Sequence, residues 1–161
     1  MTSILLIPRV LADDFGPNEL EKNITFTLEV IGKAECSITS RGTDLGDVYE
    51  AQIVDGGEYK KTLIDYSIFC SRPPKNNAFK MKLSWSREAQ INGKSALLTN
   101  TPNLGLLVYH DNTLLKNNAV IDFTIFSGQP KLYVIPTKPN GVALQQAGAF
   151  NATLVMSLDY Q

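Results

Sequence analysis

The chain has 161 residues, of which 43% are apolar and 19% charged, and its 15 basic and 16 acidic side chains give a formal net charge of −1. This length and composition predict one globular domain that is large enough for a two-layer core. Nucleic acid is excluded as a partner because a phosphate backbone attracts a strong excess of Lys and Arg. No apolar run approaches the roughly 18 residues that cross a bilayer.

The first twelve residues, MTSILLIPRVLA, differ in character from the rest of the chain. Residues 4–7 form a short apolar block, and residues 10–12 resemble the small-residue end of a secretory signal. The basic n-region and the longer apolar region of a full signal are missing. We therefore expect residues 1–12 to be a partial signal peptide, and an ordinary N-terminal strand is the alternative.

The segment after residue 12 begins polar and then alternates. Residues 13–22 carry Gly16 and Pro17 and are expected to be flexible. From residue 23 onward, apolar and polar side chains alternate, which is the period of a strand with one buried face. The apolar positions are Ile24, Phe26, Leu28 and Val30. Gly32 then interrupts the pattern, as a break or bulge does.

The chain contains two cysteines, Cys36 and Cys70. Neither has a neighbouring Cys or His at metal-ligand spacing. Two cysteines behind a signal remnant favour one structural disulfide in an oxidising compartment, worth about 3–4 kcal/mol on the chain-entropy model. Two free, buried thiols are the alternative. Cys36 and Ile38 are expected to lie on the next strand.

The middle of the chain contains two longer strand patterns. One runs from about Tyr59 to Cys70, after a hairpin-type turn signal at Gly56–Gly57. Its apolar positions are Leu63, Tyr66, Ile68 and Cys70. Pro73 and Pro74 then require a loop. In the second pattern, alternation with Lys and Ser predicts a strand that buries Phe79, Met81, Leu83 and Trp85.

The second half of the chain is predicted to consist of short strands joined by turns. Residues 86–103 are polar and irregular and are expected to form a loop. The next strands are expected at residues 104–109, 113–115, 120–126 and 132–135. No stretch has a helical period, and several short strands separated by turn signals predict an all-β sandwich.

The most regular pattern is at the C-terminus. Residues 150–160 alternate strictly, with Val155 as the one apolar residue on the polar side. The apolar positions are Phe150, Ala152, Leu154, Met156, Leu158 and Tyr160. Such alternation predicts one buried and one solvated face along the strand. The chain ends one residue beyond Tyr160.

The sequence offers no catalytic constellation, and we expect no cofactor, no metal site and no enzymatic activity. His110 is the only histidine, and it stands beside Asp111 in a predicted turn without a nucleophile motif. Asp44 and Asp47 flank Gly46, but two carboxylates alone are a weak calcium signal. Exposed strand lysines are expected to solubilise the surface and protect strand edges. These are Lys60, Lys61, Lys80 and Lys82.

Taken in order, these pieces resemble a pilin of the chaperone–usher family. The matching pieces are the strand NITFTLEV before the first cysteine, Cys36-Ser37-Ile38 followed by Leu45-Gly46-Asp47, the second cysteine after a strand, LGLLVY leading into His110-Asp111-Asn112, and the ending GAFNAT through Leu158-Asp159-Tyr160-Gln161. The resemblance covers essentially all of the chain after residue 12. Each piece is moderately specific, and their order and spacing carry the comparison.

The resemblance implies an incomplete immunoglobulin-like sandwich that a donated strand completes. It implies a periplasmic chaperone that donates the missing strand and an outer-membrane usher, where the N-terminal extension of the next subunit replaces the chaperone. Such a protein passes through the periplasm to a fimbrium on the cell surface and supports cell adhesion. Main-chain hydrogen bonds supply affinity in this mode of binding, and alternating pockets supply specificity.

The resemblance also assigns roles to parts of this chain. Residues 13–30 are the donor-strand extension and residues 31–161 the pilin domain. The donor side chains are Ile24, Phe26, Leu28 and Val30. The acceptor groove, which also binds the chaperone, is formed by Phe150, Ala152, Leu154, Met156, Leu158 and Tyr160. Neighbouring subunits of a homo- or heteropolymer are the expected partners.

Two departures from the family pattern leave alternatives open. Glu29 stands where donor segments usually carry Gly, and the extension before Cys36 is long, so the donor side chains can also lie further back, with Phe15 and Leu20 among them. A tip adhesin or receptor-binding subunit is the alternative function, with residues 86–103 as a candidate binding loop. A self-complete secreted sandwich that binds a small ligand is a third possibility.

Overall fold

The computed structural model describes residues 19–20 and 36–160. Nearly all of its regular structure is β, with two single-turn 3₁₀ helices. The elements in chain order are β1 (Glu19–Leu20), β2 (Cys36–Ser40), β3 (Val48–Tyr49), η1 (Glu50–Gln52), β4 (Thr62–Leu63), β5 (Tyr66–Cys70), β6 (Ala78–Ser84), β7 (Glu88–Ile91), β8 (Lys94–Leu98), β9 (Gly105–His110), β10 (Thr113–Leu114), β11 (Ala119–Thr124), η2 (Ile125–Ser127), β12 (Leu132–Thr137) and β13 (Val155–Tyr160).

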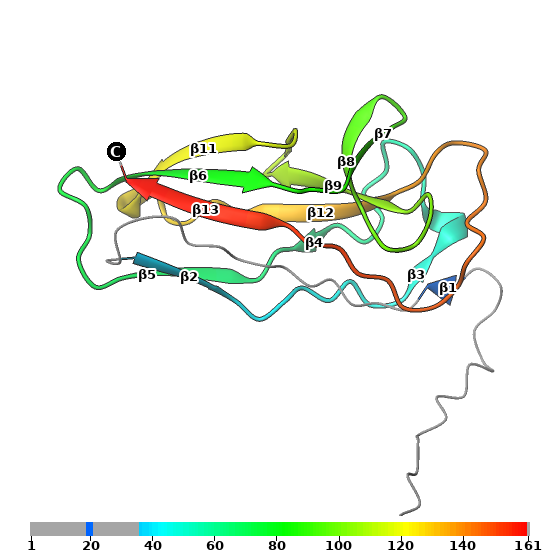
Figure 1. Cartoon of the computed structure of the whole chain (residues 1–161), viewed down its shortest axis with the longest axis horizontal. Helices are drawn as coiled ribbons and strands as arrows, with labels where there is room; N and C mark the ends of the chain where they lie inside the picture. Colours follow the sequence, from blue (N-terminus) through cyan, green and yellow to red (C-terminus); the bar gives the residue numbers. More distant parts are fainter. Residues whose placement is uncertain (1–18, 21–35, 161) are drawn as a thin grey trace, which may run out of the picture.

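The strands form open sheets that extend along the long axis of the molecule (Figure 1). One sheet has the order β4-β12-β9-β8-β7, with β10 also paired to β9, and a second has the order β11-β6-β13. Two-strand ladders join β2 to β5 and β1 to β3. All the ladders between these strands are antiparallel. The prediction of an all-β sandwich is confirmed.

The three-stranded sheet follows the alternation seen in the sequence. In β6, Phe79, Met81 and Leu83 are at most 1% exposed, whereas Lys80 and Lys82 point to solvent. β6 is the central strand, with β11 on one side and β13 on the other. Its apolar face therefore lies against the core, and its lysines lie on the outer face.

The expected long strand from Tyr59 to Cys70 is instead two short strands in different ladders. β4 pairs with β12, and β5 pairs with β2. The chain changes partner between them, but the side-chain alternation continues across the break: Ile64 and Tyr66 are 2% and 5% exposed, whereas Leu63 is 52% exposed. Leu63, which was expected among the apolar positions of this strand, has the opposite parity to Tyr66, Ile68 and Cys70 and therefore lies on the outer face.

The expected loop at residues 86–103 contains a hairpin formed by β7 and β8. Its two-residue turn is Asn92-Gly93, and both residues have positive φ, 51° and 75°. Asn-Gly is the preferred pair for a type I′ turn, whose twist matches that of paired strands. This signal was present in the sequence, but the polar residues around it concealed the strands. Ile91 and Ala96 pack with Leu107 in a small second core.

One large apolar core joins the sheets. It includes Met81 from β6, Leu106 from β9 and Met156 from β13, each 0% exposed. No helix within the described ranges is long and apolar enough to cross a membrane.

Candidate functional site

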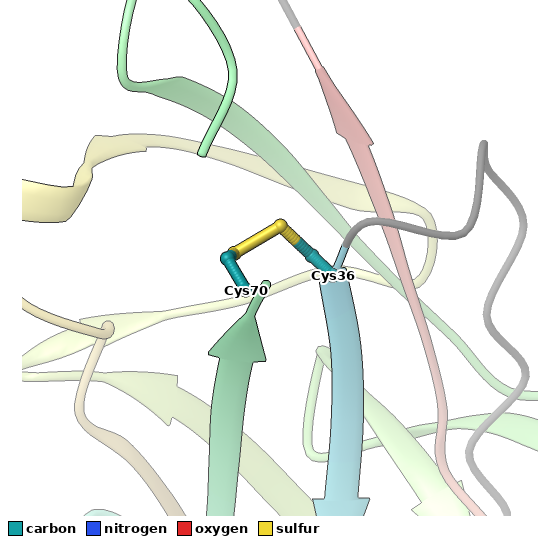
Figure 2. Close-up of a disulfide and its surroundings, with 2 residues drawn as sticks. All are labelled: Cys36 and Cys70. Carbon is teal, nitrogen blue, oxygen red and sulfur yellow. A yellow bond between two sulfur atoms is a disulfide. The ribbon is translucent and has the colours of Figure 1, made fainter. Parts of the chain in front are cut away.

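A disulfide joins Cys36 and Cys70 and fixes one end of the sandwich (Figure 2). Cys36 is the first residue of β2 and Cys70 is the last residue of β5, and the two are directly opposite in the ladder. The bond therefore ties the start of β2 to the end of its neighbour. The predicted disulfide is confirmed.

The C-terminal strand sends one row of side chains into the core. Phe150, Leu154 and Met156 are 0% exposed, Leu158 is 2% exposed and Ala152 is 4% exposed. The backbone of Tyr160 pairs with Phe79, and its side chain lies outside the described residues. Ladder pairing begins only at Val155, so the strand is shorter than its alternating pattern. The predicted inward face is nevertheless confirmed from Phe150 to Leu158.

β13 is also an edge strand of its three-stranded sheet. Among the described strands, β13 pairs only with β6, and β2 pairs only with β5. Both contribute to the same core, β2 through Cys36 and Ile38. A sheet-edge strand of this kind offers a row of main-chain donors and acceptors on which a further strand can add. β13 thus combines an apolar inward face with an edge that is open among the described strands.

The proposed donor side chains Ile24, Phe26, Leu28 and Val30 lie outside the described residues, as do residues 1–12. One short piece of the predicted extension is described. Glu19 and Leu20 form β1, which pairs with Tyr49 and Val48 of β3. This ladder lies at the opposite end of the long axis from the disulfide (Figure 1).

A mostly apolar hollow of about 350 Å³ opens at the disulfide end. Ile68 and Cys70 of β5, Phe79 of β6, Phe123 of β11 and Ile125 of η2 line it, with Pro73, Gly128 and Gln129. Two aromatic side chains that the sequence analysis missed flank it in the chain: Phe69 is 70% exposed and Phe126 is 84% exposed. Phe69 follows the strand alternation, in which it falls on the outward side.

Buried hydrogen bonds hold the walls of this hollow. The Tyr66 hydroxyl donates to the carbonyl oxygen of Pro130, and Gln129 Nε2 donates to the Tyr66 carbonyl at 2.7 Å. Burial raises the pKa of Tyr66, so this hydroxyl stays protonated as a donor at physiological pH. The Ile125 amide donates to the Asn77 carbonyl at 3.0 Å and ties η2 to the β5–β6 loop.

The opposite end of the molecule is tied together by polar contacts between loops. The carboxylate of Glu50, which is 8% exposed, accepts a hydrogen bond from the Leu144 amide at 2.7 Å. Lys94 in β8 forms a 2.8 Å ion pair with Asp55. The hydrogen bond and charge of Lys94 lower the pKa of Asp55. These contacts hold η1, the β7–β8 hairpin and the loop before β13 at one end.

The described residues contain no group of three or more His, Cys, Asp or Glu side chains that is placed to hold a metal ion. His110 is the last residue of β9, and its Nε2 lies 3.5 Å from Oδ2 of Asp111. Asp111 occupies the following turn with a φ of 51°. Elsewhere on the surface, Glu88 accepts hydrogen bonds from Ser95 and Asn117, and these lower its pKa. These polar side chains hold loops in place.

Comparison with known proteins agrees with the fold. The family model described as fimbrial protein matches residues 24–161. The fimbrial-like protein YfcQ of Escherichia coli (strain K12) is 27% identical over 145 residues, covering 88% of each chain. The fimbrial-like protein YfcR of the same organism is 35% identical over 130 residues, covering 78% of this chain and 73% of its own.

A solved structure shows the same architecture. The P pilus adaptor subunit PapF superposes with a TM-score of 0.54 at 20% sequence identity, over 78% of this chain and 95% of PapF. Its immunoglobulin-like fold and the open sheets described above correspond. The family match spans most of the sequence, from residue 24 to its last residue. The chain therefore belongs to the fimbrial protein family, whose members are structural subunits of fimbriae on the cell surface.

Proposed function

We propose that this subunit polymerises by donor-strand exchange, in which residues 13–30 of one copy add a strand to β13 of its neighbour. The observation that carries the proposal is β13 itself. Its inward side chains Met156 and Leu158 continue a row that starts at Phe150 and is at most 4% exposed, and its outer edge has no partner among the described strands. An added strand forms main-chain hydrogen bonds along that edge and places alternate side chains in the core.

The donor side chains that fit this edge are Ile24, Phe26, Leu28 and Val30, which share one parity. Burying four such side chains contributes roughly 6–12 kcal/mol before the cost of ordering the strand. Antiparallel addition continues the pattern of the described ladders and is slightly more stable per residue than parallel pairing. In that orientation Val30 lies near the start of the neighbour's β13.

The same edge accounts for the other partners. An unpaired edge beside an apolar face aggregates readily. A periplasmic chaperone that donates a strand to β13 would protect it, and an outer-membrane usher would exchange that strand for the next subunit's extension. The resulting fibre would support cell adhesion at the surface.

Donor-peptide binding tests the proposal. The chain is expressed in the periplasm without residues 1–30, and its thermal unfolding is measured with and without a peptide spanning residues 21–32. We expect a marginally stable protein that forms a heat-resistant 1:1 complex. A peptide carrying Phe26→Asp and Leu28→Asp is the matched control, since it keeps the main chain but loses two apolar contacts. A stable monomer that is indifferent to both peptides would refute the proposal.

A further inference from the structure

The two ends of the molecule carry different exposed surfaces. We define the disulfide-end surface by Phe69, Arg72, Lys75, Ile125 and Phe126. We define the opposite-end surface by Asp44, Asp47, Tyr49, Val54 and Val142. The loop between β5 and β6 and the helix η2 lie at one end of the long axis, and β3 and η1 lie at the other (Figure 1).

Both surfaces expose apolar side chains that the core does not use. At the disulfide end, Phe126 is 84% exposed and Phe69 is 70% exposed, beside the apolar hollow of about 350 Å³. At the opposite end, Val54 is 64% exposed. Tyr49 and Val142 are 38% and 37% exposed. Exposed apolar side chains that lie together on one surface are typical of sites that contact another protein.

Two exposed cations lie at the disulfide end and two exposed carboxylates at the opposite end, where the Lys60 ammonium also lies close to Gly46. Arg72 and Lys75 are exposed on the β5–β6 loop and form no ion pair with any described residue. Asp44 and Asp47 are exposed beside β3 and likewise form no ion pair among the residues that the structure describes. Opposite potentials on two surfaces steer them together and fix their orientation.

The donor-strand geometry brings these two ends together. Six residue steps separate Val30 from Cys36, and they span at most about 20 Å when fully extended. Cys36 is bonded to Cys70, next to Phe69 and the β5–β6 loop. With antiparallel addition, Val30 lies near the start of the neighbour's β13. β13 starts near the middle of the long axis, and the segment before it runs to the opposite end (Figure 1). A donor chain that continues in the same direction beyond Val30 carries its disulfide end toward the opposite end of the receiving subunit.

We propose that the disulfide-end surface of one subunit docks on the opposite-end surface of a second copy, as a second contact between successive subunits. This inference rests on the proposed donor-strand exchange and names a further part of the same interface. The contact is heterologous, joining different patches of identical chains, and such contacts build open filaments when the rotation does not close a ring. In this contact, Phe69, Phe126 and the hollow of one subunit receive Val54 and Tyr49 of the next. The charged side chains of both surfaces lie around these apolar contacts.

Cross-linking of full-length chains tests which surfaces meet. One variant carries Asn76→Cys beside Lys75, and another carries Ala51→Cys near Tyr49; both positions are exposed and leave the four charges intact. A bismaleimide linker is applied to each variant alone and to their mixture. We expect severalfold more dimer in the mixture than in either variant alone. Equal yields, or more dimer within one variant, would overturn the proposal.

Charge reversal supplies the second readout. Arg72→Glu with Lys75→Glu is expected to lower the mixed cross-link yield about tenfold at low salt, because two favourable pairs become repulsive. Asp44→Lys with Asp47→Lys should do the same, and mixing the two reversed chains should restore the yield. In 0.5 M salt the difference should shrink, because the charges are screened. Unchanged yields, or loss without restoration, would contradict head-to-tail docking.

The two proposals fail separately in these experiments. The donor-peptide assay involves neither end surface, so loss of peptide binding counts against donor-strand exchange alone. The reversed chains should bind the donor peptide as the parent chain does. If reversal abolishes peptide binding as well, the charged loops act on β13 rather than on a second subunit, and the docking proposal is wrong.

Discussion

Replacement of Leu154 by alanine tests whether the inward row that leads into β13 holds the sandwich together. Leu154 is 0% exposed and belongs to the main core. Truncating a buried leucine removes its transfer free energy and leaves a cavity, which together cost about 3–5 kcal/mol. Globular domains have about 5–15 kcal/mol of total stability. The variant should therefore lose a large part of it, and its Tm should fall by about 10 °C.

The protein carries its own probe for this measurement. Trp85 is the only tryptophan and is 3% exposed, and Asn117 holds its backbone through hydrogen bonds of 2.7 and 2.9 Å. Its fluorescence reports unfolding in denaturant for the full chain. Asn151→Ala is the matched control, since Asn151 is on the same segment but exposed. Equal destabilisation by both substitutions would refute the assignment of an inward and an outward face.

Three further changes test other parts of the fold by the same unfolding assay. Replacing Cys36 and Cys70 together by serine should lower the free energy of unfolding by about 3–4 kcal/mol, and a reducing agent should then have no further effect. The Glu88 carboxylate has a pKa lowered from its ordinary value of 4.5, mainly through the Ser95 hydroxyl. Its stabilising effect should be present above that value and lost as pH falls through the lower folded-state pKa, and Glu88→Gln should flatten that loss. Gly105→Ala should cost about 1–3 kcal/mol, because an added Cβ would lie 2.8 Å from Ile91 Cδ1 and 3.1 Å from the Cβ of the buried Ala96; an unchanged midpoint would contradict this close packing.

Side-chain alternation let the sequence predict the strands that bury one face. β6 and β13 were found because each side chain's environment follows from its parity, and parity is a local property of the chain. The disulfide could also be predicted, since the chain has only two cysteines and they can form only one intramolecular bond. The same local pattern predicted the buried row from Phe150 to Leu158, and only the resemblance to pilins assigned it the role of candidate acceptor.

The sequence by itself therefore determined the fold class, the disulfide and the inward face of β13. Tertiary structure decided where strands change partners: β4 pairs with β12, whereas β5 pairs with β2. It also decided that the hairpin of residues 88–98 pairs with β9, and that Phe69 and Phe126, which are far apart in the sequence, lie at the same end. The physical reason is that partner choice and exposure depend on residues distant in sequence, and local periodicity carries no information about them.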